Sequence, residues 1–320
     1  MIKTTVVIPN YNGIKYIEDC LSSLKKSSVE LKIIVVDNGS SDGSRQLVEE
    51  KFPEVRLICF EENTGFCKAV NTGIMASETE YVMLLNNDTV AEERMAECLE
   101  DALGENPKLF SAAAKMINMY EPDKIDSAGD FYSALGWAYA RGKDKPVDKY
   151  SIQDKVFSAC AGAALYRRKV FETIGYFDEN HFAYLEDMDI GYRANIYGFK
   201  NIYVPDAHVF HAGSGVSGSR HNEFKVKLSS RNSVYLIWKN MPFLQIILNL
   251  PFLVFGYLIK TLFFIKKGLG KTYVKGLMQG VKLSLSKEGR KRRVRFSCQH
   301  LWNYCVIQWE LWKGMVLRFF

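Results

Sequence analysis

The segment TTVVIPN, at residues 4–10, is a short run of mostly β-branched residues that ends in proline and asparagine. Similar runs recur as LKIIVVDN at residues 31–38, VRLICFEE at 55–62 and EYVMLLNND at 80–88. Amphipathic stretches near residues 14–27, 44–51, 66–77 and 92–104 follow them and predict helices. Buried strands that alternate with helices predict an α/β fold, in which helices cover both faces of a mostly parallel, Rossmann-like sheet.

The composition is that of a folded protein. Of 320 residues, 48% are hydrophobic and 24% are charged, which argues against a disordered chain or a polytopic membrane protein. The seven cysteines are scattered and form no CxxC pair, which favours free thiols in a reducing compartment. The apolar run at the N-terminus is too short for a signal peptide, so the chain is expected to begin in the cytoplasm.

Polar residues end all four predicted strands: Pro9-Asn10-Tyr11-Asn12, Asp37-Asn38-Gly39-Ser40, Glu62-Asn63-Thr64-Gly65 and Asn86-Asn87-Asp88. Each group alone could be only a turn or a helix cap. In a parallel sheet, however, these ends meet at one edge, where α/β proteins bind ligands. Tyr11 could cover a base, Asp37 could accept a hydrogen bond from it, and Gly65 would allow close backbone approach. Asp88 could bind a divalent cation that bridges two phosphates, so the edge suits a nucleoside diphosphate with a metal.

Two other nucleotide sites are excluded by the first strand end. A dinucleotide site needs G-x-G-x-x-G after this strand, and a P-loop needs G-x-x-x-x-G-K-[ST]. The sequence has P-N-Y-N-G there instead.

The second half of the chain is less regular. LFSAAAKMIN at residues 109–118 predicts a strand, residues 130–142 an aromatic hairpin, and residues 155–179 a strand that leads into a helix. LEDMDIGYRANIYGFK at 185–200 predicts a helix with acids in its first turn. A last strand at 201–213 delivers His208 and His211.

Taken in order, the segments VVIPNYNG, IIVVDNGSSDGS, ENTGFCKAVNTG, LLNNDT and LEDMDIGYR resemble glycosyltransferase family 2, whose members have the GT-A fold. The resemblance covers about residues 3–215, and it is greatest to bacterial rhamnosyltransferase-type enzymes that build cell-surface polysaccharides on lipid-linked acceptors. It implies an inverting, metal-dependent transfer of a sugar from a nucleotide-diphosphate donor to a hydroxyl group of the acceptor.

The resemblance also implies roles for individual residues. Pro9, Asn10, Tyr11, Asp37, Gly65, Asn71 and Asn87 would bind the donor nucleotide, with Asn87 near the ribose. Asn86-Asn87-Asp88 stands where the family has its DXD motif, so Asp88 would ligate Mg2+ or Mn2+, with His211 as a further candidate ligand. Glu186-Asp187 matches the acidic motif on the acceptor side, and Asp187 would be the general base. Two alternatives remain open. His211 could have a purely structural role, and Glu186 and Asp187 could only complement the N-terminus of a helix.

The C-terminal part has the composition of a membrane anchor. Residues 241–265 are apolar and long enough for a bilayer, but Gln245, Asn249, Pro251 and Lys260 interrupt them. A helix broken at Pro251, lying on or re-entering the membrane, fits at least as well as a clean span, and a buried helix pair is a third possibility. Eleven Lys or Arg residues between Lys266 and Arg295 face one acid, Glu288, and several aromatic residues follow. Together these features favour binding to an anionic membrane surface. Binding to nucleic acid is not favoured, because no nucleic-acid motif accompanies the charge.

The sequence therefore predicts a catalytic domain at residues 1–237 and a helical membrane-association region at residues 238–320. The enzyme would act at the cytoplasmic face of the membrane on an acceptor linked to a polyprenyl diphosphate. Removal of the chain after residue 237 is expected to leave donor binding intact. A nucleotidyltransferase and a non-catalytic sugar-nucleotide-binding subunit remain as alternatives. The sequence does not decide the sugar, the linkage or the oligomeric state, and a homo-oligomer is possible.

Overall fold

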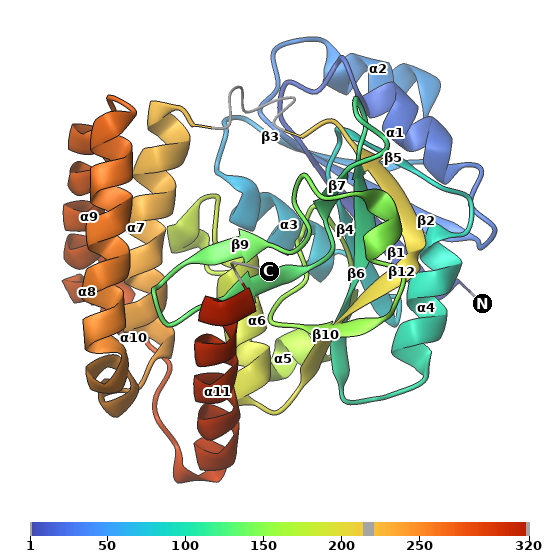
Figure 1. Ribbon diagram of the computed structural model, residues 1–320. Coiled ribbons are helices and arrows are strands. Elements are labelled where there is room, and N and C mark those ends of the chain that lie inside the picture. The colour runs from blue at the N-terminus through green and yellow to red at the C-terminus, as the bar shows by residue number, and fades with distance from the viewer. Residues whose placement is uncertain (1, 214–220, 318–320) are drawn as a thin grey trace.

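The central feature of the computed structural model, which describes residues 2–213 and 221–317, is a twisted mixed sheet (Figure 1). Its strands lie in the order β10-β12-β6-β11-β4-β1-β2-β3, with β5 paired to β12 and β7 paired to β6. The strands are β1 (Thr4–Asn10), β2 (Leu31–Asn38), β3 (Arg56–Phe60), β4 (Tyr81–Leu85), β5 (Thr89–Ala91), β6 (Leu109–Asn118), β7 (Ile125–Ser127), β10 (Asp154–Val156), β11 (Ala163–Arg167) and β12 (Lys200–His211). The predicted α/β class is confirmed.

The first four long strands are parallel, as the sequence predicts. β1 pairs with β2 and β4, and β2 pairs with β3. In this register Asn10 lies beside Asp37, and Asn38 lies beside Phe60. The polar residues that end these strands therefore meet at one edge of the sheet.

The second half of the sheet is not parallel throughout. β11 lies between β4 and β6 and runs antiparallel to both. After the long excursion that follows β6, the chain returns through the sheet as β11, in the direction opposite to β4 and β6. Side-chain alternation predicts a strand but carries no information about its direction, which is why the sequence did not show this reversal.

Helices cover both faces of the sheet. Apolar side chains of α1 (Ile17–Leu24), α2 (Ser44–Lys51) and α4 (Met95–Gly104) pack on one face, and those of α3 (Phe66–Met75), α5 (Val170–Ile174) and α6 (Glu186–Ile196) pack on the other. The strand residues that fill these cores, such as Val6, Val7 and Leu84, are fully buried. The near-continuous apolar strands in the sequence follow from this burial on two sides.

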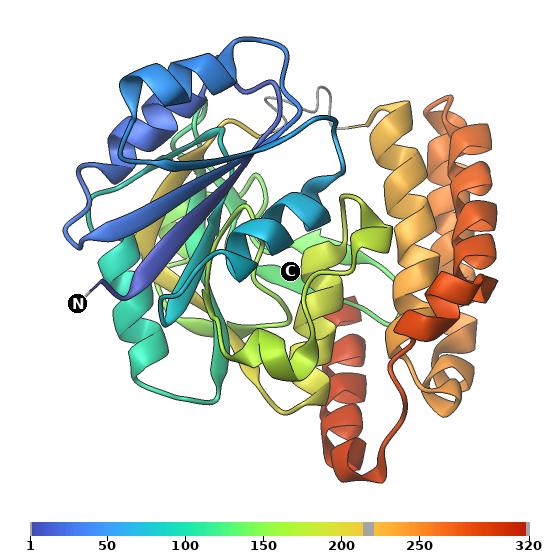
Figure 2. The same cartoon turned by 180° about the vertical axis from the view of Figure 1, so that it is seen from behind.

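The C-terminal helices share a core with the sheet domain. They are α7 (Glu223–Asn240), α8 (Phe243–Lys266), α9 (Gly270–Leu285), α10 (Lys287–Arg292) and α11 (Leu301–Leu317). Leu253 of α8 and Leu311 of α11 pack with Tyr192 of α6 and with the hairpin formed by β8 (Asp130–Tyr132) and β9 (Ala138–Ala140). Figures 1 and 2 show α7, α8 and α9 as a layer of helices beside the sheet domain.

The predicted domain boundary at residue 237 falls inside α7. Two residues beyond it, the Lys239 ammonium bonds to the carboxylates of Asp178 and Asp189 at 2.8 Å each, and the Asn240 amide also donates to Asp189. A cut at residue 237 would remove the partners of these buried carboxylates. Truncation there would therefore disturb α6 and is not a clean test of the C-terminal region.

α8 is one continuous helix, so the predicted break at Pro251 is wrong. A proline inside a helix removes one backbone hydrogen bond, but α8 is held on both sides of it by Asn249 and Leu253, which are buried against the domain. By length and composition α8 could cross a membrane, and 17% of its most apolar window is buried. Its buried residues form one stripe, which consists of Gln245, Asn249, Leu253, Gly256 and Phe264. The polar residues that interrupt the apolar run thus face the protein, and most apolar residues face outward.

Candidate active site

A chain of buried hydrogen bonds joins the ends of β1, β2 and β4. The Asn87 amide donates to Asn10 Oδ1 at 2.7 Å, and the Asn10 amide donates to Asp37 Oδ2 at 2.8 Å. All three side chains are buried. Gly13 lies against this chain, and a Cβ there would come within 2.0 Å of Asn87 Nδ2. These predicted donor-binding residues are therefore brought together, and the bonds between them fix the relative positions of three loops.

Tyr11 is the exposed member of this group. Its side chain is 40% exposed, whereas Asn10 beside it is fully buried and Pro9 is half-buried. Asp37 is also enclosed, because its carboxylate accepts from Asn10 and from the backbone of Ser40. Tyr11 is thus free to cover a flat ring, while Asp37 holds the loop beneath it. Contacts of Pro9, Tyr11 and Asp37 with a nucleotide remain predictions.

Gly65 and Asn71 have structural contacts that the sequence did not reveal. Gly65 has φ +92°, and a Cβ on it would lie 2.6 Å from the Phe182 ring. The close approach that this glycine allows is therefore to Phe182, in the segment before the acidic pair. Asn71 donates to the carbonyl of Phe177 and accepts from its N–H. These bonds explain Asn71 as a link between α3 and that segment.

Asp88 lies beside His211, as a shared metal site requires. His211 Nε2 is 3.3 Å from Asp88 Oδ1, and the Ala212 N–H donates to the Asp88 carbonyl at 3.0 Å. On its other side, His211 Nδ1 is 2.8 Å from Asp126 Oδ2. Burial alone would lower the pKa of His211, but its hydrogen bonds to the carboxylates of Asp126 and Asp88 outweigh burial and raise the pKa to about 9.

This arrangement fits a divalent ion. Metal-bound histidines usually donate their second ring N–H to a carboxylate, which turns the free nitrogen toward the metal. Asp126 supplies such a carboxylate, so His211 Nε2 and the Asp88 carboxylate point to one place. An ion bound there would replace the proton on Nε2. Asp126, which was not singled out in the sequence, is the residue that makes the metal role of His211 chemically reasonable.

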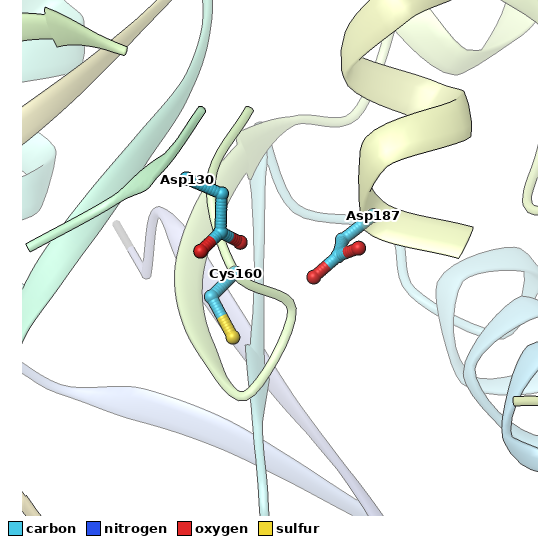
Figure 3. A group of neighbouring side chains, drawn as sticks. All are labelled: Asp130, Cys160 and Asp187. Carbon is cyan, nitrogen blue, oxygen red and sulfur yellow. The ribbon is translucent and has the colours of Figure 1, made fainter. Parts of the chain in front are cut away.

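Asp187 lies opposite the buried Asp130 and the partly accessible Cys160, which come from other parts of the chain. It is the second residue of α6, and it extends toward Asp130 of β8 and Cys160 (Figure 3). One carboxylate oxygen of each acid and the Cys160 sulfur lie within 4.8 Å of one another. Asp130 is 8% exposed, and Asp187 is partly accessible. Asp130 was also not recognised in the sequence, although it stands four residues after Asp126 in an otherwise apolar segment.

The surroundings of Asp130 and Asp187 determine which of the two carboxyl groups is protonated. Burial raises the pKa of Asp130 well above its usual range, and the charge of Asp187 raises it further. Burial also raises the pKa of Asp187, but the Met188 N–H and the Asp130 side chain bond to its carboxylate and limit the rise. Asp130 is therefore the neutral partner, which donates a hydrogen bond to an ionised Asp187. Burial also raises the pKa of the Cys160 thiol well above its usual range, which disfavours the thiolate that would bind a metal. Asp130, Cys160 and Asp187 together therefore make a poor metal site.

Glu186 differs from its neighbour. Burial, together with the charge of Asp187, raises the pKa of Glu186 to about 8. Its Oε2 atom is buried and has no hydrogen-bond partner among the described residues. Near neutral pH Glu186 is thus mostly a carboxylic acid, which can donate a hydrogen bond but does not readily accept a proton. Of the two predicted catalytic acids, Asp187 is the one suited to act as a base.

The loop before α6 is strained and is held from α7. Phe182, Tyr184 and Leu185 all have positive φ, a conformation that side chains disfavour. The Asn232 amide donates to the carbonyls of His181, Ala183 and Tyr184 at 2.7 to 2.9 Å. These bonds offset the strain, so α7 helps to set the position of Glu186 and Asp187, the two candidate catalytic acids.

Residues 5–175 match the family model named Glycosyl transferase family 2, which covers more than half of the chain. The chain belongs to glycosyltransferase family 2. It is also similar to the N-acetylglucosaminyl-diphospho-decaprenol L-rhamnosyltransferase of Mycobacterium tuberculosis, with 26% identity over 264 residues, 71% of this chain and 84% of the relative. The family that the sequence motifs of this glycosyltransferase imply is therefore confirmed.

Solved structures support the GT-A fold of this glycosyltransferase. The mannosyltransferase PcManGT from Pyrobaculum calidifontis, solved with GDP-Man and Mn2+, is 17% identical, with a TM-score of 0.53 over 98% of this chain and 86% of that chain. GalNAc-T7, solved with UDP, GalNAc and Mn2+, is 14% identical, with a TM-score of 0.60 over 75% of this chain. This chain spans 48% of that structure. At these identities the likeness concerns the fold alone.

Within this glycosyltransferase, one short segment links the two halves of the site. Asp126, in β7, contacts the metal candidate His211, and Asp130, at the start of β8, contacts the base candidate Asp187. Between them Gly129 has φ +89°, and a Cβ there would lie 2.4 Å from Val156. The segment 126–130 therefore sets where the candidate metal ligand His211 lies relative to the candidate base Asp187. A sequence signal was present, because two acids in an apolar, buried stretch need a partner.

Proposed function

We propose that this glycosyltransferase is an inverting, metal-dependent enzyme of cell-surface polysaccharide synthesis. It would transfer a sugar, with rhamnose as the leading candidate, from a nucleotide-diphosphate donor to a hydroxyl group of a lipid-linked saccharide. The observation that carries the proposal is the pairing of an accessible, ionised Asp187 with a neutral Asp130 on the acceptor side of a nucleotide-binding edge. An inverting transfer needs one such base and no covalent nucleophile.

The mechanism follows from the roles of these side chains. Asp187 accepts the proton of the acceptor hydroxyl as that oxygen attacks the anomeric carbon, and the donor's diphosphate leaves from the opposite face. Asp130 keeps Asp187 ionised by donating a hydrogen bond to it. Asp88 and His211 would hold a divalent ion, which neutralises the charge that develops on the departing diphosphate. The hydrogen-bonded ends of β1, β2 and β4 keep the donor loops in place.

The nature of the acceptor is inferred from a relative. The mycobacterial relative is named for an acceptor that carries a saccharide on decaprenyl diphosphate. The exposed apolar surface of the C-terminal helices fits an acceptor of this type, because its lipid tail stays in the bilayer. Holding the enzyme at that surface would raise the effective concentration of the acceptor.

We propose that α8 lies along the membrane surface and does not cross it. Four contacts tie it to the protein along its length, and they involve α6, α11, the β8–β9 hairpin and α7: Gln245 with Tyr192, Asn249 with Gln308, the Gly256 carbonyl with Trp137, and Tyr257 with Ser233. A helix held in this way cannot be surrounded by lipid. Its outer face, including Leu244, Leu248 and Phe255, is more than half exposed and is available to the interface.

The function is tested by product analysis. With a lipid-linked saccharide and a panel of UDP-, GDP- and dTDP-sugars, we expect acceptor-dependent release of nucleoside diphosphate and inversion at the anomeric carbon. The released nucleotide is identified by chromatography and the anomer by NMR. Release of pyrophosphate would instead indicate a nucleotidyltransferase. A lack of turnover with every donor and acceptor would favour a binding subunit.

The membrane proposal predicts a loss of vesicle binding. Replacing Leu244, Leu248 and Phe255 with Gln should weaken binding to anionic vesicles at least about tenfold, since each buried apolar side chain contributes about 1.5–3 kcal/mol. Co-sedimentation measures binding, and thermal unfolding checks that the exposed substitutions leave the fold intact. Ile152→Gln, at a site 78% exposed on the catalytic part, is the matched control. Undiminished binding of the triple variant would contradict the proposal.

A further inference from the structure

A groove separates α7 from α9 on the surface of the helical layer. The two helices approach closely at Gly276 and Gly280, where a Cβ would come within 2.4 Å of Ser230 or of the Arg231 carbonyl. Beside this contact lies a groove of about 570 Å³, lined by Phe224, Lys227, Leu228, Arg231, Gln279, Lys282, Leu283 and Ser286. The active-site chemistry described above uses none of these side chains.

The lining of the groove is cationic. Lys227, Arg231 and Lys282 contribute three positive charges, and no carboxylate lines it. Among the described residues, neither lysine forms an ion pair within 4.0 Å, and both lysines are exposed. The nearest acids in sequence are Glu223 and Glu288, which lie outside the lining. Unpaired cations that converge on one groove are suited to a ligand with several negative oxygens.

One side of the groove leads to the catalytic loop. Phe224 contacts the rings of Phe182 and Tyr184, with centroids 6.3 Å apart in both cases. Arg231 Nη2 donates to the carbonyls of Asn180 and His181 at 2.8 and 2.7 Å. This loop continues directly into Glu186 and Asp187. The groove is therefore connected to the acceptor side of the active site by short protein contacts.

The other side of the groove meets apolar surface. Met278, Val281 and Leu285 of α9 are 69%, 49% and 51% exposed, and they alternate along the helix with the lining residues Gln279, Lys282 and Leu283. Apolar surface, a cationic groove and the catalytic loop thus follow one another across the molecule. This is the order of lipid tail, diphosphate and sugar in a polyprenyl-linked saccharide.

We infer that the groove between α7 and α9 binds the diphosphate of the lipid-linked acceptor. The inference rests on the proposed function and adds a binding site to it. Lys227 and Lys282 neutralise the phosphate oxygens, and the exposed apolar residues of α9, Met278, Val281 and Leu285, contact the first carbons of the lipid. The bound diphosphate places the attached sugar toward the loop that carries Asp187.

The test compares two double variants with equal loss of charge. Lys227→Gln with Lys282→Gln removes the two groove lysines, and Lys271→Gln with Lys275→Gln removes two exposed lysines of α9 outside the lining. We expect the groove variant to raise KM for the lipid-linked acceptor about tenfold or more, with donor KM unchanged. The control should keep the wild-type acceptor KM. Equal rises in both variants would show only bulk attraction to the membrane, and no rise in either would also overturn the inference.

A binding measurement separates this inference from the proposed function. Neutral phosphatidylcholine vesicles that carry a polyprenyl diphosphate should bind the wild type about tenfold or more tightly than the groove variant. Vesicles in which phosphatidylglycerol supplies the same charge should not distinguish the groove variant from the control. This result needs no turnover, so it stands even if no saccharide is transferred. Equal binding of the groove and control variants to the diphosphate vesicles would contradict the groove site.

Discussion

Replacing Asp187 with Asn is expected to lower kcat by about 10²–10⁴-fold, the usual contribution of a general base. The amide keeps the shape of the side chain and its contact with Asp130, but it cannot accept the proton of the attacking hydroxyl group. Steady-state transfer to a lipid-linked acceptor measures the effect. The melting temperature with and without nucleoside diphosphate checks that the donor still binds, because a bound ligand stabilises the folded state by mass action.

The control for this variant is Asp101→Asn, at an exposed position of α4, which packs on the face of the sheet opposite to α6. It makes the same chemical change and should keep wild-type kcat. Full transfer activity in Asp187→Asn would show that these acids only complement the N-terminus of α6.

The pH dependence of the reaction tests the link between Asp187 and Asp130. Burial raises the pKa of Asp187, and only its ionised form is a base, so the rate should fall as pH decreases through a value above that of an ordinary aspartate, about 3.9. Asp130→Ala removes a hydrogen bond to the ionised form, which should raise that pKa and move the acid limb to higher pH. Asp130→Asn can still donate this bond and should restore the limb toward the wild-type position. Identical profiles for both variants would exclude a positioning role for Asp130.

Replacing Asp88 with Ala is expected to remove metal-dependent turnover. Lewis-acid stabilisation of a leaving group provides several kcal/mol, so the rate with saturating Mn2+ should fall by about 10²–10⁴-fold. Calorimetric titration of the protein with Mn2+ and nucleoside diphosphate should show weakened metal binding, a readout that does not depend on turnover.

Asp126→Asn is the informative companion to this variant. It leaves both candidate ligands in place but alters the group that orients His211, so Mn2+ affinity should fall by about 10–100-fold. Wild-type Mn2+ affinity in Asp88→Ala would show that Asn86-Asn87-Asp88 is only a turn. Wild-type affinity in Asp126→Asn would argue for a structural His211.

The sequence was most informative where one short segment decides its own structure. The strands at residues 4–10, 31–38 and 109–118 and the helix at residues 44–51 have the predicted bounds. It was least informative about Pro251, because the continuity of α8 there depends on contacts with other elements, which no local pattern records. The polar residues of α8 were read as interruptions of an apolar surface, but they are the side that binds the protein.

By itself, the sequence determined the α/β class, the edge of the sheet where the donor loops meet and the family, because each follows from local patterns and ordered motifs. Only the tertiary structure brought Asp126 to His211 and Asp130 to Asp187, and it also placed a cationic groove beside the loop before α6. These groups lie 85 and 57 residues apart in the chain, at positions 126 and 211 and at positions 130 and 187. Hydrogen bonds and charges act over a few ångströms, so their partners are decided by packing and not by spacing along the sequence.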